Sequence, residues 1–125
     1  MTITDLLKNI EKLRNYRGCI LVSSLKELEN NPSIFREILM VSRVAGRRLY
    51  IFIEGRPSQW ATKIRDYLSE NIDVSVYLYE IKGLDALVKE LKDICSKDKL
   101  LFVSAEYADK LASQENIFCG EKIVI

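Results

Sequence analysis

The sequence predicts a three-layer α/β/α sandwich built on a mostly parallel, doubly wound sheet of four or five strands, the Rossmann-like class. Two observations carry this prediction. Short continuous apolar runs alternate with segments of helical period, and such runs are typical of strands buried on both faces. Connections of about ten residues or more between them favour βαβ crossovers and hence parallel pairing. The 125-residue length is that of one α/β domain, 1–125.

Four apolar runs are the predicted strands: 19–22, 49–53, 74–79 and 100–103. The third is rich in β-branched and aromatic residues, which favour strands. The tail has two interpretations. It forms either a hairpin that turns at Gly120–Glu121 or one short final strand at 123–125.

Helices are predicted where apolar residues recur at helical spacing. Thr2 with Asp5, and Ser24 with Glu27, have the spacing of capping boxes, so a helix is expected to begin after each pair. Gly46 stands where a left-handed C-terminal cap belongs. The predicted helices are 3–13, a short one after Ser24, 32–45, 60–68, 84–94 and 105–112.

Charge and hydropathy exclude several classes of protein. The chain has 19 basic and 18 acidic residues, a net charge of +1, so it has no bulk field for nucleic acid or an anionic membrane. No apolar segment approaches the roughly 18 to 20 residues that span a bilayer. The amino terminus has acidic residues and helical period, unlike a signal peptide. We therefore expect a cytoplasmic protein, and the 30% charged fraction fits a thermophilic source.

The three cysteines, Cys19, Cys95 and Cys119, are predicted to be structural thiols. An odd number without Cys-x-x-Cys spacing argues against a disulfide framework and against a zinc site. Cys19 and Cys119 lie in apolar runs, where cysteine behaves as a small hydrophobe. A reducing cytoplasm follows from this interpretation.

The absence of histidine is the most informative negative. It removes Ser-His-Asp and Cys-His catalysis, histidine-ligated metals and the usual proton shuttle near neutral pH. Neither a Gly-x-Gly-x-x-Gly motif nor a P-loop is present, so no cofactor is assigned. The sequence predicts neither a hydrolase nor an oxidoreductase with a conventional active site, and we assign no catalytic residue.

Any ligand is expected at the carboxyl ends of the parallel strands, where such sheets bind ligands. Helix N-termini there offer N–H groups, and an arginine fork suits phosphate or carboxylate. The candidate ligand-binding residues are Ser23, Ser24, Glu54, Gly55, Arg56 and Ser104. The competing interpretation is that Ser24 and Ser104 are N-caps and that Glu54 is a solvated strand end.

Two other kinds of site remain open. A Mg²⁺-dependent or anion-binding enzyme requires carboxylates that converge at the same edge, and the candidates are Glu54, Glu80 and Glu106. A nucleic-acid-binding protein requires one exposed basic stripe, and the candidates are Arg43, Arg47 and Arg48.

From Ile20 to Tyr79 the predicted order is strand, serine, helix ending in Ala45–Arg48, strand, helix, strand. This order resembles one half of a phospholipase D-like domain. The run 99–103 is similar to the strand that carries that family's catalytic lysine. The family's catalytic histidine has no counterpart here, so the resemblance implies a degenerate ligand-binding or regulatory relative without the activity.

The function that these observations favour is a small non-catalytic regulatory or protein-interaction module that senses a ligand. Small modules of this kind often pair through an exposed helix or an edge strand, so we expect a homodimer. The short apolar tail Lys122–Ile125 is the candidate edge.

Overall fold

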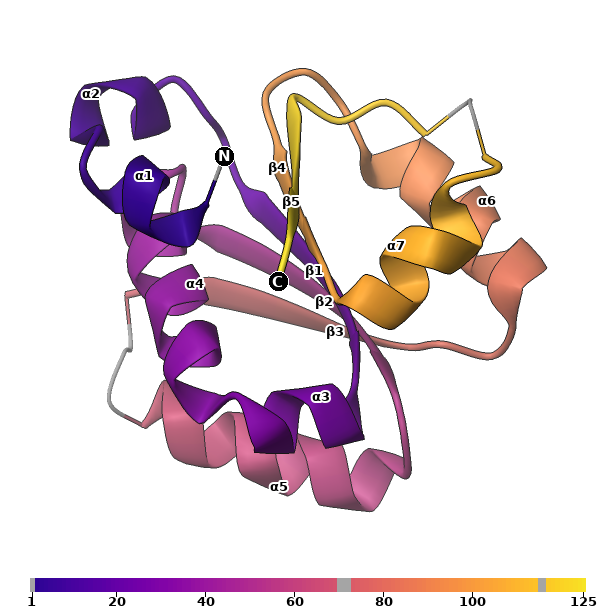
Figure 1. Cartoon of the computed structure of the whole chain (residues 1–125). Coiled ribbons are helices and arrows are strands. Elements are labelled where there is room, and N and C mark those ends of the chain that lie inside the picture. The colour runs from indigo at the N-terminus through magenta and orange to yellow at the C-terminus, as the bar shows by residue number, and fades with distance from the viewer. Residues whose placement is uncertain (1, 70–72, 115–116) are drawn as a thin grey trace.

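A computed structural model describes residues 2–69, 73–114 and 117–125. It confirms the predicted class: five strands form an all-parallel sheet in the order β3-β2-β1-β4-β5, with helices on both faces (Figure 1). The strands are β1 (Cys19–Ser24), β2 (Arg48–Glu54), β3 (Ser75–Glu80), β4 (Leu100–Val103) and β5 (Glu121–Val124). The helices are α1 (Ile3–Leu7), α2 (Ile10–Leu13), α3 (Leu25–Asn30), α4 (Pro32–Val44), α5 (Pro57–Leu68), α6 (Leu84–Ile94) and α7 (Ala105–Leu111).

The sheet separates two apolar layers. Helices α1 to α5 cover one face, and α6 and α7 cover the other (Figure 1). Successive side chains of a strand point to opposite faces. In β1, Leu21 packs with the first layer, whereas Ile20 and Val22 pack with the second. A central strand buried on both faces must be apolar throughout, which explains the continuous runs in the sequence.

The topology places a switch point between β1 and β4. From β1 the chain continues to β2 and β3 on one side, then returns to β4 on the other side. Val22 is the register partner of Val103, and the Ser104 N–H donates to the Val22 carbonyl at 3.0 Å. Ser23, near the end of β1, and Ser104, directly after β4, therefore lie at the carboxyl ends of neighbouring strands, where doubly wound sheets bind ligands.

The segment 3–13 forms two helices, α1 and α2, so the prediction of one continuous helix is wrong. The Asn9 side chain accepts a hydrogen bond from the Lys12 N–H at 3.3 Å and starts α2 afresh. This break turns Ile10 outward, where it is 47% exposed instead of buried. The Thr2–Asp5 capping box at the start of α1 is confirmed, with both of its hydrogen bonds formed.

The tail is one strand, so the hairpin interpretation is wrong. Strand β5 pairs in parallel with β4, and the Ile125 N–H donates to the Val103 carbonyl at 2.9 Å. Ile123 is buried against the first layer, whereas Val124 on the other face is exposed. The tail therefore forms one edge of the sheet.

Candidate functional site

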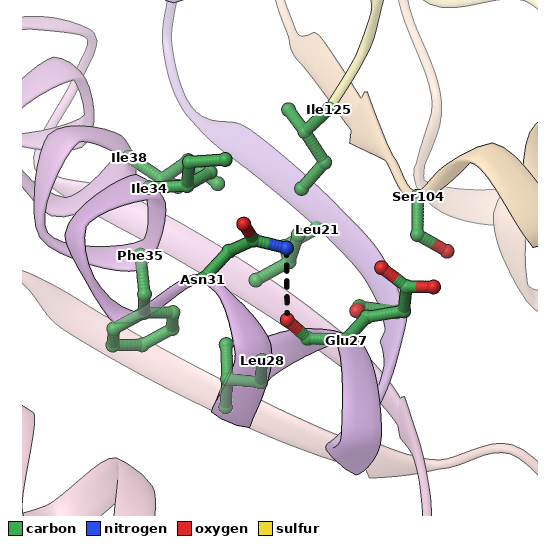
Figure 2. Close-up of a pocket in the computed structure, with 10 residues that line it drawn as sticks. Leu21, Glu27, Leu28, Asn31, Ile34, Phe35, Ile38, Ser104 and Ile125 are labelled. Carbon is green, nitrogen blue, oxygen red and sulfur yellow. Dashed lines mark hydrogen bonds between the residues drawn. The ribbon is translucent and has the colours of Figure 1, made fainter.

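A narrow cavity opens at the carboxyl ends of β1 and β4 (Figure 2). Its volume is about 20 Å³, enough for roughly one water molecule. The cavity lies at the switch point of the sheet, between the ends of the central strands and helices α3 and α4. Its walls are Leu21, Ser23, Glu27, Leu28, Asn31, Ile34, Phe35, Ile38, Ser104 and Ile125.

The hydroxyl of Ser104 is the outstanding polar group of this cavity. Ser104 is fully buried, and its Oγ has no hydrogen-bond partner within the part of the chain that the structure describes. Ser104 occupies the N-cap position of α7, but its side chain makes no capping bond, so the capping interpretation is wrong here. An unpaired buried hydroxyl costs about 1–3 kcal/mol, which makes this position one that needs an explanation.

Glu27 contributes an unpaired carboxylate to the same cavity. The Ser24 hydroxyl accepts from the Glu27 N–H at 3.2 Å, which confirms Ser24 as an N-cap. The reciprocal bond of a full capping box is not formed. Among the described residues the Glu27 carboxylate has no partner, and in Figure 2 it is turned toward Ser104.

The rest of the wall is mostly apolar. Leu28 and three residues of α4 form one side, with Leu21 and Ile125 across from them. Ser23 is buried and satisfied, because its hydroxyl donates to the Ser24 carbonyl at 3.1 Å. An apolar pocket with a few converging polar groups is the usual form of a small-molecule site. Helices α3 and α7 are too short to contribute a strong dipole, so binding rests on side chains.

Glu54 belongs to a second hollow on the same edge, separate from the Ser104 cavity. Its carboxylate accepts a hydrogen bond from the Tyr107 hydroxyl. Burial, together with this carboxylate, raises the pKa of Tyr107 above its usual value. The hollow has a volume of about 240 Å³, and Lys110 lies over the Tyr107 ring at 4.9 Å from its centroid.

Gly55 and Arg56 lie outside both hollows. Gly55 has φ +150°, and a Cβ there would lie 2.9 Å from the Cβ of Leu25, so glycine permits a close approach of this loop to the start of α3. Its carbonyl accepts from the Trp60 indole N–H at 3.2 Å, and Trp60 is buried in the core. Arg56 is exposed at the N-cap of α5. The structure therefore brings Ser23 and Ser104 together and leaves the other candidates elsewhere.

The carboxylates proposed for Mg²⁺ do not form a site in the described residues. No group of three or more cysteine, aspartate or glutamate side chains there is arranged to hold a metal ion. Glu106 instead pairs with Lys110 at 3.2 Å on the surface of α7. Glu80 lines a hollow along β3 and α6 that includes neither Glu54 nor Glu106.

The three candidate arginines do not form one stripe. Arg43 and Arg47 line an open hollow with Arg14 at the opposite edge of the sheet, and Arg43 pairs with Asp73 at 3.4 Å. Arg48 begins β2, and strand alternation places it on the α6–α7 face with Tyr50. A continuous basic surface for nucleic acid is thus not assembled from these residues.

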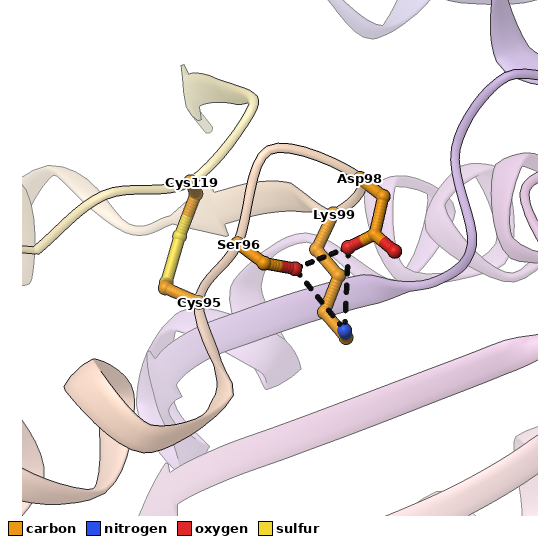
Figure 3. Close-up of a disulfide and its surroundings, with 5 residues drawn as sticks. All are labelled: Cys95, Ser96, Asp98, Lys99 and Cys119. Carbon is orange, nitrogen blue, oxygen red and sulfur yellow. Dashed lines mark hydrogen bonds and ion pairs between the residues drawn. A yellow bond between two sulfur atoms is a disulfide. The ribbon is translucent and has the colours of Figure 1, made fainter.

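The structure joins Cys95 and Cys119 in a disulfide (Figure 3). The prediction of free thiols is therefore wrong for this pair. Cys95 caps the end of α6, Cys119 precedes β5, and their Cα atoms are 4.8 Å apart although 24 positions separate them in sequence. Cys19 is a buried free thiol, as predicted, and burial raises its pKa to about 12.

Comparison of the chain with protein-family models, curated proteins and solved structures finds no match. The resemblance of 20–79 to half of a phospholipase D-like domain thus gains no support from these comparisons. None of the described helices is long and apolar enough to cross a membrane.

Sequence reasoning missed Glu27, Asn31, Ile125 and the apolar wall of the cavity. The missing information was the strand order, because only the pairing of β1 with β4 brings Ser104 beside the start of α3. One signal was present in the sequence. Glu27 lies three positions after the serine N-cap Ser24. A carboxylate at that position either accepts a hydrogen bond from the N-cap backbone N–H or is free to contact a ligand.

Proposed function

We propose that this domain is a small non-catalytic regulatory module that senses a small molecule in the cavity between β1 and β4. The observation that carries the proposal is the buried, unpaired Ser104 hydroxyl at the switch point of the sheet. A bound ligand would give this hydroxyl its missing hydrogen bond. The energy of that bond would contribute to binding, since no described residue of the protein provides it.

The cavity also suits sensing because it joins separate parts of the chain. Leu21 belongs to β1, Leu28 to α3, Ile38 to α4 and Ile125 to the end that follows β5. A ligand that enters a 20 Å³ cavity must move some of these walls apart. Because the interior is close-packed, such a movement shifts α3 and α4 relative to the sheet. That shift is the proposed signal.

A thermal-shift screen of small polar molecules tests the proposal. The screen uses the wild type, the Ser104→Val variant and Arg56→Ala as a matched surface control. Valine removes the hydroxyl and fills its space, so molecules that stabilise the wild type are expected to lose their effect on Ser104→Val. They should keep it on Arg56→Ala. Molecules that stabilise all three proteins equally bind elsewhere and contradict the proposal.

We also propose that the module forms a homodimer, and two sheet edges are candidates for the contact. Strand β5 has only four residues, and Glu121 and Lys122 lie on it. Strand β3 has six residues and exposes Tyr77 (43%) and Leu78 (39%). Edge strands are usually blunted by charges or prolines, and β3 has only Glu80 at its end. These differences support β3, in place of the predicted tail, as the proposed contact.

The backbone of β3 has a self-complementary register. The Ser75 and Ile81 N–H groups donate toward β2, to the carbonyls of Arg47 and Ile53. Strand alternation then directs the groups of residues 76, 78 and 80 to the open edge. A two-fold axis normal to the sheet at Leu78 would pair these residues antiparallel with those of a second copy.

Two variants test which edge forms the contact. Leu78→Lys should give a monomer by light scattering, and Val124→Lys should leave the dimer intact. The reverse result would move the interface to β5.

The cytoplasm remains our proposed location. Disulfides are rare in the cytosol of mesophiles but common inside hyperthermophiles, so the Cys95–Cys119 bond supports a thermophilic source more than a mesophilic one. Alkylation of thiols in freshly lysed source cells, followed by mass analysis, tests whether the Cys95–Cys119 bond exists in the cell. Three alkylated cysteines would mean that the bond is absent in the cell.

A further inference from the structure

We propose that the ligand of the cavity is a small protonated amine with a short apolar substituent. This inference rests on the proposed function, since it names the chemical class that the same site accepts. The decisive feature is that, of the described residues that line the cavity, only Glu27 has a charged side chain.

An ionised carboxylate only accepts hydrogen bonds, so the group beside Glu27 must donate. The part of the cavity wall that the structure describes has no lysine or arginine that could neutralise this charge. The positive charge must therefore come with the ligand. Glu27 would repel an anionic ligand. This repulsion excludes the phosphates and carboxylates that the sequence predicted as ligands at the carboxyl ends of the strands.

A primary ammonium group has three N–H donors, and the site offers acceptors of the right kind. The Ser104 hydroxyl is unpaired and can accept one bond. Glu27 can accept a second through a charge-assisted bond. The amide nitrogen of Asn31 donates to the Glu27 carbonyl at 3.4 Å, and its amide oxygen points away from Ser104 in Figure 2, so the third N–H of the ammonium group is left to solvent.

The volume of the cavity limits the size of the ligand's head group, and the apolar walls determine which substituent that group can carry. A volume of about 20 Å³ holds one water-sized group, which an ammonium head matches. Leu28, Ile34, Phe35 and Ile38 then face whatever is attached to that head. A methyl or ethyl group gains by burial against them, whereas a charged or hydroxylated substituent does not.

NMR titration of the amide-labelled protein with methylammonium and ethylammonium chloride tests this inference. Ethanol and sodium acetate serve as neutral and anionic probes, and sodium chloride keeps the ionic strength constant. The amines are expected to give saturable shifts at the amides of Glu27 and Ser104. Ethanol should bind at least tenfold more weakly, since it carries no positive charge to form an ion pair with the Glu27 carboxylate, and acetate should not bind.

Two glutamates of α3 provide a matched pair of variants. Glu27→Gln keeps the Ser24 cap, which uses only the backbone N–H, and should weaken amine binding about tenfold. Glu29→Gln changes an exposed residue of the same helix and should leave binding within twofold.

Three results would overturn the assignment of an amine. Equal binding of ethanol and amine, or no effect of Glu27→Gln, would show a neutral ligand while leaving the proposed sensing site intact. The absence of any saturable shift would mean that the cavity holds a structural water only. A different result contradicts the proposed function: molecules from the thermal-shift screen that stabilise Ser104→Val as much as the wild type.

Discussion

Replacing Ser104 with alanine should stabilise the protein, although mutations of buried residues usually destabilise. The reason is the unpaired hydroxyl. Ser104 is fully buried, and its Oγ has no hydrogen-bond partner among the residues that the structure describes. Alanine has no group that needs one. A stabilising loss of a polar group is the behaviour expected of a position kept for binding at the expense of stability.

The magnitude follows from the cost of an unsatisfied hydroxyl, about 1–3 kcal/mol, less the packing that the lost oxygen provided. We expect a net gain of about 1 kcal/mol in the free energy of unfolding. With an unfolding entropy of about 2.1 cal/mol/K per residue, a 125-residue chain has roughly 0.26 kcal/mol/K in total. The gain then corresponds to a rise of about 4 °C in Tm.

Urea and thermal denaturation of the wild type and two variants measure this effect. Ser42→Ala is the matched control, because Ser42 is equally buried but its hydroxyl donates to the Ile38 carbonyl at 2.8 Å. Losing that bond should cost about 1 kcal/mol. The two alanine variants are therefore expected to change stability in opposite directions.

A loss of stability in Ser104→Ala similar to that of Ser42→Ala would refute the reasoning. It would show that the Ser104 hydroxyl is already satisfied in the free protein. The cavity would then be a structural water site, and the proposals built on the unpaired group would lose their basis.

Three further predictions concern the cysteines and the sheet edge. Because the disulfide closes a loop over a separation of 24 residues, reducing Cys95–Cys119 should lower the free energy of unfolding by about 3.5 kcal/mol in a denaturation experiment; unchanged stability in reductant would mean the bond is unimportant. Burial raises the pKa of Cys19 from 9.0 to about 12. Above pH 9 the thiol therefore loses its proton in the unfolded chain before it does so in the folded protein. Stability is full below pH 9 and falls as the pH rises toward 12. We expect the free energy of unfolding of the wild type, but not of Cys19→Ala, to fall by about 1 kcal/mol by pH 10, and an identical pH profile for the variant would contradict this prediction. Leu78→Lys should shift sedimentation from dimer to monomer, whereas Val124→Lys should leave the dimer intact.

The fold was predictable because both faces of the central strands are buried, so both faces require apolar side chains. The runs at 19–22, 49–53 and 100–103 are apolar at each position, and only a sheet covered on both faces requires that. The break in the first helix was less visible. Ile10 has helical spacing from Ile3, but the Asn9 side chain competes for the backbone and starts a new helix.

The candidate site was predictable in its location and not in its members. The rule of the carboxyl edge selected Ser23 and Ser104, which the structure places at one cavity. The same rule selected Glu54, which the structure places in a different hollow with Tyr107. Strand order decides which loops meet, and it depends on long-range pairing that no local pattern encodes. Cys95 and Cys119 meet for the same reason.

Binding of a small molecule between the ends of β1 and β4 can be measured by mapping amide chemical shifts with the strongest molecule from the thermal-shift screen. We expect the largest shifts at Glu27, Leu28, Ile34 and Ser104. Shifts confined to the hollow of Tyr107 and Lys110, or to the arginine-lined hollow at the opposite edge, would contradict this expectation.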